Sequence, residues 1–300
     1  AQQVAAALTG GTGTLIEVKK TAKQTPPPAA YDLTELQRDA NKKYAYSAKE
    51  TLSIMQNLYE VHKLLTYPRT DSRYISDDVV PILLSRPLQT KYLVNNAKVS
   101  DHHAIIPTEE QPELWRLSGP ERNIYDLVVR RFLAVLLPPF QYEEVTLKVQ
   151  VGDHILHAKG KLVKEQGWRA AYDRSFSLEE DEGEEEEKDQ TLPELRQGDK
   201  LPVRWANTQP GQTAPPKRYT EATLLTAMEH PAAQVKDKDQ SRILEETGGL
   251  GTPATRADII EKLFSAFYIE RRGKELWPTS KGIQGISPRA GSRRAPLWRR

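Results

Sequence analysis

The spacing of apolar residues changes along this chain, and the change limits what it can fold into. In residues 47–65, apolar side chains recur every three or four positions, which is typical of one face of a helix. From about residue 140, the segments YEEVTLKVQV, HILHAKGKLV and GWRAAYD instead alternate apolar and polar residues, which predicts half-exposed antiparallel strands. A chain of 300 residues is long enough for two or three domains with their own cores. We therefore expect a multidomain α/β (α+β) protein with separate helical and β-rich parts.

Start and stop signals bracket the expected elements. Ser47 with Glu50, and Ser118 with Glu121, have capping-box spacing, and Pro138-Pro139 should stop the second helix. Residues 1–24 predict a helix end and a strand, TLIEVKKTAK, before the proline-rich stretch TPPPAAYD marks a domain crossing. GDKLPVRWANTQP resumes the strand pattern. Helices return in YTEATLLTAMEH and TPATRADIIEKLF, and the latter leads into a short turn and a small β-ribbon, a winged-helix type of layout.

Composition excludes several classes of function. The chain has no cysteine, which rules out disulfides, Cys-ligated zinc and thiol catalysis, and fits a reducing, cytoplasmic location. No apolar run approaches the roughly 20 residues that span a bilayer, so we expect no membrane partner. The net charge is only +2, but a local basic groove can still bind nucleic acid. The acidic run at residues 179–189 predicts a solvated loop.

The segment LTYPRTDSRYIS combines groups that suit phosphate chemistry. A tyrosine hydroxyl attacks phosphorus poorly because it is mostly protonated at neutral pH, so Tyr67 would need cationic help. Arg69 is close enough in sequence to share one phosphate, Asp71 could orient that arginine, and Pro68 stiffens the turn between them. On composition alone, however, a Tyr-Pro-Arg stretch after a helix is usually just a turn.

The segment SDHHAIIPT places Asp101 before His102 and His103, which suggests metal binding or proton handling. A phosphoesterase metal site would need further Asp/His clusters, and a tyrosine-plus-metal nicking enzyme would need histidines separated by one residue. The third reading is a histidine that contacts a DNA phosphate or moves a proton near Tyr67. Structural packing is the remaining alternative.

The segment ETGGLGTPATRADII predicts a tight loop that enters a helix. Its three glycines allow sharp turns, Thr252 can cap the helix, and Pro253 suits the first helical position. A helix N-terminus of this kind can bind a phosphate, although the loop lacks the Gly-Lys-Ser/Thr ending of a Walker A motif. A purely structural helix entry has the same composition.

Taken together and in this order, LTYPRTDSRYIS, SDHHAIIPT, YTEATLLTAMEH and GLGTPATRADIIEKL resemble the type IA DNA topoisomerases, and most closely the bacterial topoisomerase III branch. The resemblance runs from the first residues to about Gly282. It implies that Tyr67 attacks a single-stranded DNA backbone and holds the 5′ phosphate, that Arg69 holds the scissile phosphate, and that His102 lies near the cleaved strand. It also implies a set of DNA-binding residues: Asp71, Ser72, His103, Thr252, Thr255 and Arg256.

The family fold implies a toroid made of segments that leave a domain and return to it. By this resemblance, residues 1–27 and 146–218 form a β-rich arch that lets the ring open. Residues 28–145 form a helical domain with the catalytic tyrosine, and residues 219–282 a helical, winged-helix-like base. Residues 283–300 are an Arg-rich tail outside the family pattern, which an out-of-frame or foreign origin would explain.

The family also has an N-terminal domain whose catalytic glutamate and acidic cluster bind magnesium. That domain is expected before residue 1, so Mg²⁺ is an implied cofactor with no ligand in this chain, and the chain alone should be inactive. Two hypotheses follow: the tyrosine-bearing portion of an ATP-independent topoisomerase, or a non-catalytic module that binds single-stranded DNA. The resemblance further implies single-stranded DNA, a RecQ-family helicase and a single-strand-binding protein as partners, and a location in the bacterial nucleoid.

Overall fold

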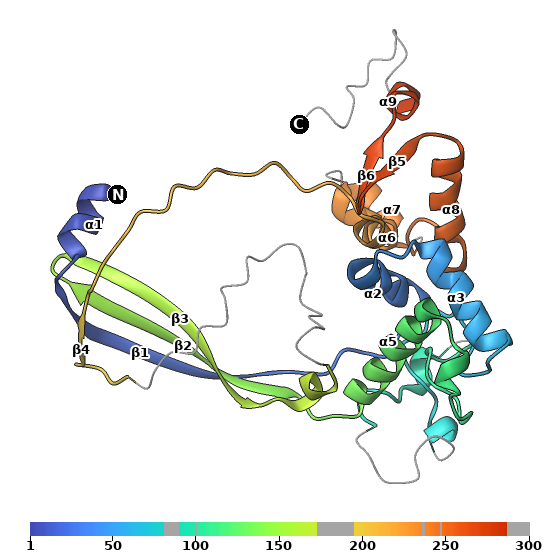
Figure 1. The fold of residues 1–300 in the computed structure, drawn as a ribbon, viewed down its shortest axis with the longest axis horizontal. Coiled ribbons are helices and arrows are strands. Elements are labelled where there is room, and N and C mark those ends of the chain that lie inside the picture. The colour runs from blue at the N-terminus through green and yellow to red at the C-terminus, as the bar shows by residue number, and fades with distance from the viewer. Residues whose placement is uncertain (81–89, 100, 173–194, 236–237, 247, 287–300) are drawn as a thin grey trace. The chain divides into compact units, whose positions relative to one another are not determined.

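A computed structural model of the chain describes residues 1–80, 90–99, 101–172, 195–235, 238–246 and 248–286. The chain forms two compact units (Figure 1). The sheet unit comprises Ala1–Pro27 and Leu137–Pro215, and the helical unit comprises Pro28–Leu136 and Pro216–Arg300. The first segment of the helical unit is therefore inserted between the two segments of the sheet unit. The acidic run at 179–189 and residues 287–300 of the expected tail lie outside the described residues.

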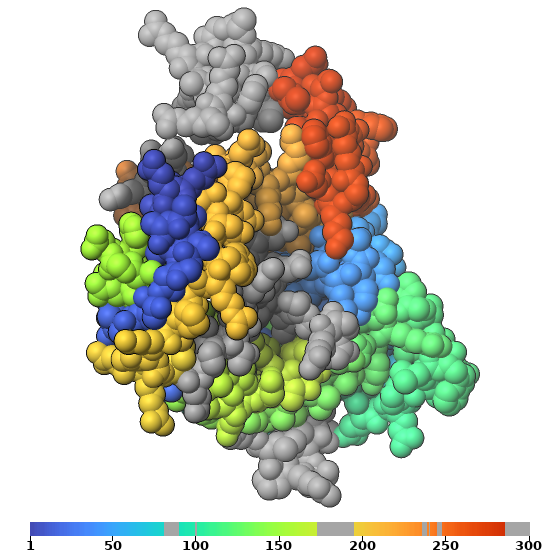
Figure 2. Space-filling view, turned by 60° about the vertical axis from the view of Figure 1, so that its left-hand side comes forward, coloured from blue at the N-terminus to red at the C-terminus, as the bar shows by residue number. Residues whose placement is uncertain are grey.

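The sheet unit is built on long antiparallel strands in the order β3-β2-β1-β4 (Figure 1). Its elements are α1 (Gln2–Leu8), β1 (Thr12–Thr25), β2 (Phe140–Val151), β3 (His154–Glu165) and the short β4 (Lys200–Pro202). β1 pairs with β2 from Thr14↔Gln150 to Thr25↔Phe140. The residues after β4 lie beside the N-terminal helix, where the Ala206 amide donates to Thr9 Oγ1 at 3.1 Å (Figure 2). The strands expected in residues 14–23, 142–151 and 154–163 are confirmed as parts of β1, β2 and β3.

Two expected strands differ. GWRAAYD is not a strand: residues Gly167–Ala171 form a 3₁₀ helix, η4. Gly167 has φ +48°, a Cβ there would lie 2.4 Å from the Pro139 carbonyl oxygen, and the Trp168 amide donates to the Pro138 carbonyl at 2.8 Å. This tight return turns the chain before a strand can form. The strand pattern of GDKLPVRWANTQP yields only the three residues of β4, because pairing with β1 stops at Pro202.

The helical unit contains most of the helices of the described residues. Its elements are α2 (Leu33–Tyr44), α3 (Ala48–Glu60), η1 (Asp77–Val79), η2 (Asn96–Lys98), η3 (Leu114–Arg116), α5 (Gly119–Val135), α6 (Glu221–Glu229), η5 (Pro231–Gln234), α7 (Lys238–Glu246), α8 (Pro253–Ser265), β5 (Ile269–Arg272), β6 (Glu275–Pro278) and α9 (Ser280–Ile286). The β5–β6 ribbon after α8 confirms the expected helix–turn–ribbon layout. None of the helices described is both long and apolar enough to cross a membrane.

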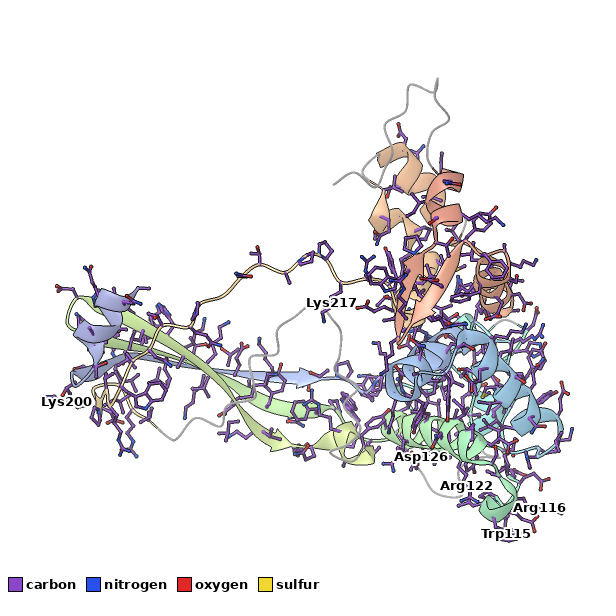
Figure 3. The ribbon with its side chains drawn as sticks, turned by 45° about the horizontal axis from the view of Figure 1, so that its top comes forward. Trp115, Arg116, Arg122, Asp126, Lys200 and Lys217 are labelled. Atoms are coloured by element: carbon purple, nitrogen blue, oxygen red, sulfur yellow. The ribbon has the colours of Figure 1, made fainter. Side chains whose placement is uncertain are left out.

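The predicted capping boxes of α3 and α5 are both present. Ser47 accepts from the Glu50 amide, and Ser118 accepts from the Glu121 amide. Trp115 and Arg116 on η3 lie just before α5, along which Arg122 and Asp126 follow (Figure 3). α3 ends earlier than its apolar spacing suggests, at Glu60.

Apolar clusters of the described residues contribute to the core of the helical unit, and two of them bear on the site. One packs Ile75, Leu93 and Ile106 against the end of α5. The other packs Leu225 and Met228 of α6 and Ile260 of α8 around the start of α3. The second cluster joins residues expected in a separate base to those expected in the tyrosine domain. The boundary expected after residue 145 falls inside β2, because the strand begins at Phe140 and the unit boundary lies between Leu136 and Leu137.

Candidate functional site

The tyrosine segment, residues 64–73, runs extended along the histidine segment, residues 101–108. Leu65 forms an antiparallel bridge with Pro107, and the Thr66 amide donates to the Ile106 carbonyl at 3.0 Å. Thr66 Oγ1 also donates to the Ala104 carbonyl at 3.1 Å. These backbone contacts bring together two motifs that are separated by more than thirty residues in the sequence.

Side chains of the tyrosine segment alternate between buried and exposed positions, as an extended backbone requires. Pro68, Thr70 and Ser72 are buried, whereas Arg69 and Asp71 are exposed. Thr70 fixes the segment, because its hydroxyl donates to the His102 carbonyl at 3.3 Å. Its carbonyl accepts from the Leu33 amide at 3.1 Å. The charged side chains that could meet a phosphate therefore stand on one side of an anchored segment.

Tyr67 is half-buried between two aromatic side chains. Its ring centroid lies 4.2 Å from that of His102, with the planes tilted by 34°, and 5.7 Å from that of Tyr59 in an edge-on arrangement. Aromatic packing of this kind limits ring motion. No hydrogen bond joins the Tyr67 hydroxyl to another of the described residues, so it is not committed to a structural partner there. The expected proximity of His102 to Tyr67 is present.

A pocket of about 210 Å³ opens beside this pair. One wall consists of residues 69–71 and 101–102, and the other of Thr252, Pro253 and Ala254 at the start of α8. The volume of several water molecules leaves room for a phosphate group. Tyr67 is not among the lining residues and adjoins the pocket through His102. The pocket thus unites Arg69, His102 and a helix N-terminus, which favour an anion, with the carboxylates of Asp71 and Asp101, which oppose one.

The entry to α8 depends on glycines with positive φ. Gly249 has φ +98°, and a Cβ there would lie 2.6 Å from the Met228 carbonyl oxygen. The adjacent Leu250 amide donates to that carbonyl at 2.7 Å. Thr252 is the N-cap, as expected, and its amide donates to Thr255 Oγ1 at 2.9 Å. The loop therefore delivers the exposed Thr252 to the pocket while Thr255 closes the capping box.

Three residues of the expected DNA-binding set have structural contacts instead of an open face. The Ser72 hydroxyl is buried and donates to the Tyr74 and Lys98 carbonyls at 3.1 and 3.0 Å. The Arg256 guanidinium is buried and donates to Thr34 Oγ1 at 3.1 Å. A ring nitrogen of His103, which is half-buried, lies 2.9 Å from the Ala104 carbonyl. A direct DNA contact from these three residues stays a prediction.

Sequence reasoning missed a set of buried charges behind the pocket. Arg73 Nε donates to Asp32 Oδ2 at 2.6 Å, and its Nη2 donates to Glu35 at 3.3 Å. Burial raises the pKa of Asp32, although Arg73 opposes this shift. Burial would also raise the pKa of Glu35, but the nearby arginines, Arg38 first, outweigh it and lower the pKa. The signal in the sequence is that Arg73 lies within the tyrosine segment.

Metal ligands are not gathered in the part of the chain that the structure describes. No group of three or more His, Asp or Glu side chains there could hold a metal ion. Asp71 and Asp101 line the pocket together with Arg69 and His102. The residues that the structure describes therefore do not fit a magnesium centre.

Comparisons with known proteins show which family the chain resembles. A family model described as DNA topoisomerase matches residues 1–287, slightly beyond the expected end of the resemblance. The chain is 54% identical to DNA topoisomerase 3 of Bacillus licheniformis over 94% of its own length and 41% of the relative. For DNA topoisomerase 3 of Bacillus subtilis the identity is 53%, over 92% of the chain and 41% of the relative. The chain thus spans about two fifths of the length of these relatives.

A solved structure agrees at the level of fold. Full-length topoisomerase I from Thermotoga maritima superposes with a TM-score of 0.71 at 23% identity, over 94% of this chain and 45% of that one. The two antiparallel sheets and the helices of this chain are thus a mixed α+β fragment of such a fold. With a family model matching nearly the whole chain, and the tyrosine and histidine motifs in contact, the chain belongs to the type IA DNA topoisomerases, in the branch of bacterial topoisomerase III.

Proposed function

We propose that this chain supplies the attacking tyrosine and a phosphate-binding pocket to a type IA topoisomerase. In this proposal the enzyme cleaves one DNA strand without ATP, passes another strand through the break and rejoins the ends. The observation that carries it is the contact of Tyr67 with His102, beside a pocket that holds Arg69 and the N-terminus of α8.

The chemistry is a reversible transfer of one phosphodiester. The Tyr67 oxygen loses its proton and bonds to phosphorus, and the bond from phosphorus to the 3′ oxygen breaks. The 3′ oxygen takes up a proton, and the 5′ phosphate stays on the tyrosine until the reverse transfer rejoins the strand. Arg69 lies where it can offset charge on the phosphoryl oxygens, and the helix N-terminus offers further favourable dipoles. In this proposal His102 contacts the same phosphate or moves a proton.

Magnesium enters the proposal as a cofactor whose ligands belong to a part of the enzyme outside this chain. DNA is the proposed partner, preferably single-stranded, because unpaired bases can stack on aromatic side chains while phosphates meet the cations. By family resemblance, the sheet unit serves as the arch of a ring, and the helical unit combines the tyrosine domain with the base. A RecQ-family helicase, a single-strand-binding protein and the nucleoid location complete the proposed setting.

The test of the chemistry is Tyr67→Phe in the full-length protein that carries this chain, with Tyr59→Phe as the matched control. Tyr67→Phe should abolish the covalent adduct with a labelled single-stranded oligonucleotide and abolish relaxation of supercoiled DNA, while binding stays within about twofold. Tyr59→Phe should keep both activities, because phenylalanine retains the ring that packs edge-on against Tyr67. An adduct that persists in Tyr67→Phe would assign the nucleophile elsewhere.

The 300-residue chain by itself should bind DNA without relaxing it. Loss of a general acid alone typically slows a reaction by about 10²- to 10⁴-fold, and the described residues form no group of side chains that could hold a metal ion. Anisotropy titrations should show tighter binding of single strands than of duplex, with affinity falling as salt rises. Equal affinity for both would contradict the proposed partner, and magnesium-dependent relaxation by this chain would contradict the proposed division of the active site.

A further inference from the structure

We infer that a buried ion network centred on Arg38 and Glu229 positions the two walls of the pocket relative to each other. The effect of this network on DNA binding rests on the proposed function. Its effect on the distance between the two walls can be tested separately. Neither residue lines the pocket. They are positioning residues, because they act through the tyrosine segment on one side and the start of α8 on the other.

The tyrosine segment is tied to the N-terminus of α2. The Leu33 amide donates to the Thr70 carbonyl at 3.1 Å, within the residues that line the pocket. Arg73, just beyond that wall, donates to Asp32 at 2.6 Å and to Glu35 at 3.3 Å. A backbone hydrogen bond and an ion pair thus fix this wall to one turn of α2.

From α2 the contacts continue to α6 through Arg38. Its Nη2 lies 2.6 Å from Glu35 and 2.8 Å from Glu229, and its Nη1 donates to Thr226 Oγ1 at 3.2 Å. Arg38 is only 8% exposed, and Glu229 is also largely enclosed. One guanidinium therefore bridges the carboxylate that holds Arg73 and the carboxylate at the end of α6.

The end of α6 in turn sets the start of α8. Met228, next to Glu229, accepts from the Leu250 amide at 2.7 Å and blocks any side chain at Gly249. Arg256 of α8 approaches Glu229 to 3.9 Å and donates to Thr34 Oγ1 of α2 at 3.1 Å. Contacts from both walls of the pocket therefore converge on Glu229 and the arginines around it.

Charge placement of this kind serves geometry better than it serves stability. Buried ion pairs contribute little net free energy compared with apolar packing, but removing one partner leaves the other charge uncompensated. The forked guanidinium of Arg38 also accepts only a narrow range of partner directions. Neutralising Glu229 leaves Arg38 and Arg256 close together without their shared counter-charge. The α8 entry should then shift or loosen against the tyrosine segment.

The absence of cysteine allows a direct distance measurement. Asp71→Cys and Ala254→Cys place one spin label on each wall, and pulsed electron resonance reports the distribution of distances between them. Glu229→Gln should broaden or shift that distribution. Glu270→Gln, which neutralises a carboxylate in an exposed pair with Arg272, should leave it unchanged. An unchanged distribution in Glu229→Gln would overturn the inference.

Binding of single-stranded oligothymidylate by the unlabelled chain gives the functional readout. Glu229→Gln should weaken it by about 2- to 30-fold, the range of coupling effects from residues that touch no ligand. Arg38→Lys should fall between the parent and Arg38→Met, because lysine keeps the charge but not the fork. Equal affinity of parent and Glu229→Gln, with the pocket walls displaced, would overturn the functional consequence of the network.

Two further outcomes are separable. If the walls move in Glu229→Gln but the parent binds no single strand, the positioning role stands and the proposed function fails. If circular dichroism shows that Glu229→Gln is unfolded, Thr226→Val replaces it, because this change removes only a hydroxyl that accepts from Arg38. Thr226→Val should then broaden or shift the distribution of distances between the two spin labels, and an unchanged distribution would overturn the inference.

Discussion

An ion pair on the face of the sheet unit differs from an ion pair in the core of the helical unit. In the sheet unit, Lys23–Glu144 joins side chains that are 44% and 35% exposed. In the helical unit, Arg131–Asp39 joins side chains that are 6% and 10% exposed. Neighbouring strands bring opposite charges together on an open face, whereas packed helices enclose them. Loss of a partner should therefore have little effect for Lys23–Glu144 and a large one for Arg131–Asp39.

The largest loss of stability is expected for Arg131→Ala. Arg131 donates to Asp39 at 2.6 Å and to the Ala29 carbonyl at 3.2 Å, and its guanidinium lies 4.1 Å from the centre of the Tyr31 ring. Removing it should lower the free energy of unfolding of the helical unit by about 3–5 kcal/mol, because Asp39 stays buried without its counter-charge. Urea unfolding followed by circular dichroism measures the loss. If Arg131→Ala lowered the free energy of unfolding no more than Lys23→Ala does, the expected difference between the buried and the exposed ion pair would be wrong.

Glycine replacements should show the same contrast with a smaller effect. Gly249→Ala forces a Cβ to within 2.6 Å of a backbone carbonyl at φ +98° and should cost about 1–3 kcal/mol. Gly152, in the β2–β3 turn, has φ +57° and open space around it, so Gly152→Ala should cost only about 1 kcal/mol. The same unfolding measurement compares the two. Equal costs would show that backbone strain alone, and not enclosure, sets the penalty.

The difference in stability between the parent and Glu121→Gln should depend on pH. Burial would raise the pKa of Glu121, but hydrogen bonds from Ser118 and Asn57 outweigh it and lower the pKa below 4.5. The folded pKa is thus below the unfolded value. The contribution of the Glu121 carboxylate to the free energy of unfolding is therefore present above about pH 4.5. It is lost as the pH falls through the pKa of Glu121 in the folded protein. Glu121→Gln should cost about 0.3–1 kcal/mol at neutral pH, because it removes a negative charge from the first turn of α5, and progressively less towards pH 3. A cost that does not change with pH would contradict the charged capping box.

The smallest effect is expected for Glu144→Gln in the sheet unit. Lys23 lowers the pKa of Glu144 through a hydrogen bond at the surface. Salt at about 1 M shortens the screening length to roughly 3 Å, so any loss of stability seen at low salt should vanish there. Thermal unfolding at two salt concentrations provides the measurement. For Arg131→Ala the loss should persist in high salt, and failure of either half would weaken the comparison.

Local signals in the sequence predicted much of the fold. The capping boxes at Ser47 and Ser118 depend on residues three apart, so they could be recognised without tertiary information. The alternation of β2 and β3 was equally local. GWRAAYD, residues 167–173, was expected as a strand because so short an alternation cannot be told from a tight turn that packs on prolines.

The candidate site was only partly predictable. The motifs of Tyr67, His102 and Thr252 could be selected by family resemblance, and the structure brings His102 into contact with Tyr67 and into the same pocket as Thr252. The network around Arg38 and Glu229 could not be predicted. Its residues look like ordinary charged positions of helices, and only the packing of α2 on α6 decides that they are enclosed.

The insertion within the sheet unit has a consequence for synthesis of the protein. Thr25 pairs with Phe140, so residues 26–139 leave the ribosome after β1 and before its main partner begins to emerge. During that interval β1 is an unpaired strand, the kind of segment that can join another chain by mistake. Lys19, Lys20 and Lys23 lie along its exposed half, and lysines on a bare strand discourage such pairing. The charges that stabilise the finished sheet so little should therefore matter most to the nascent chain, as protection against aggregation.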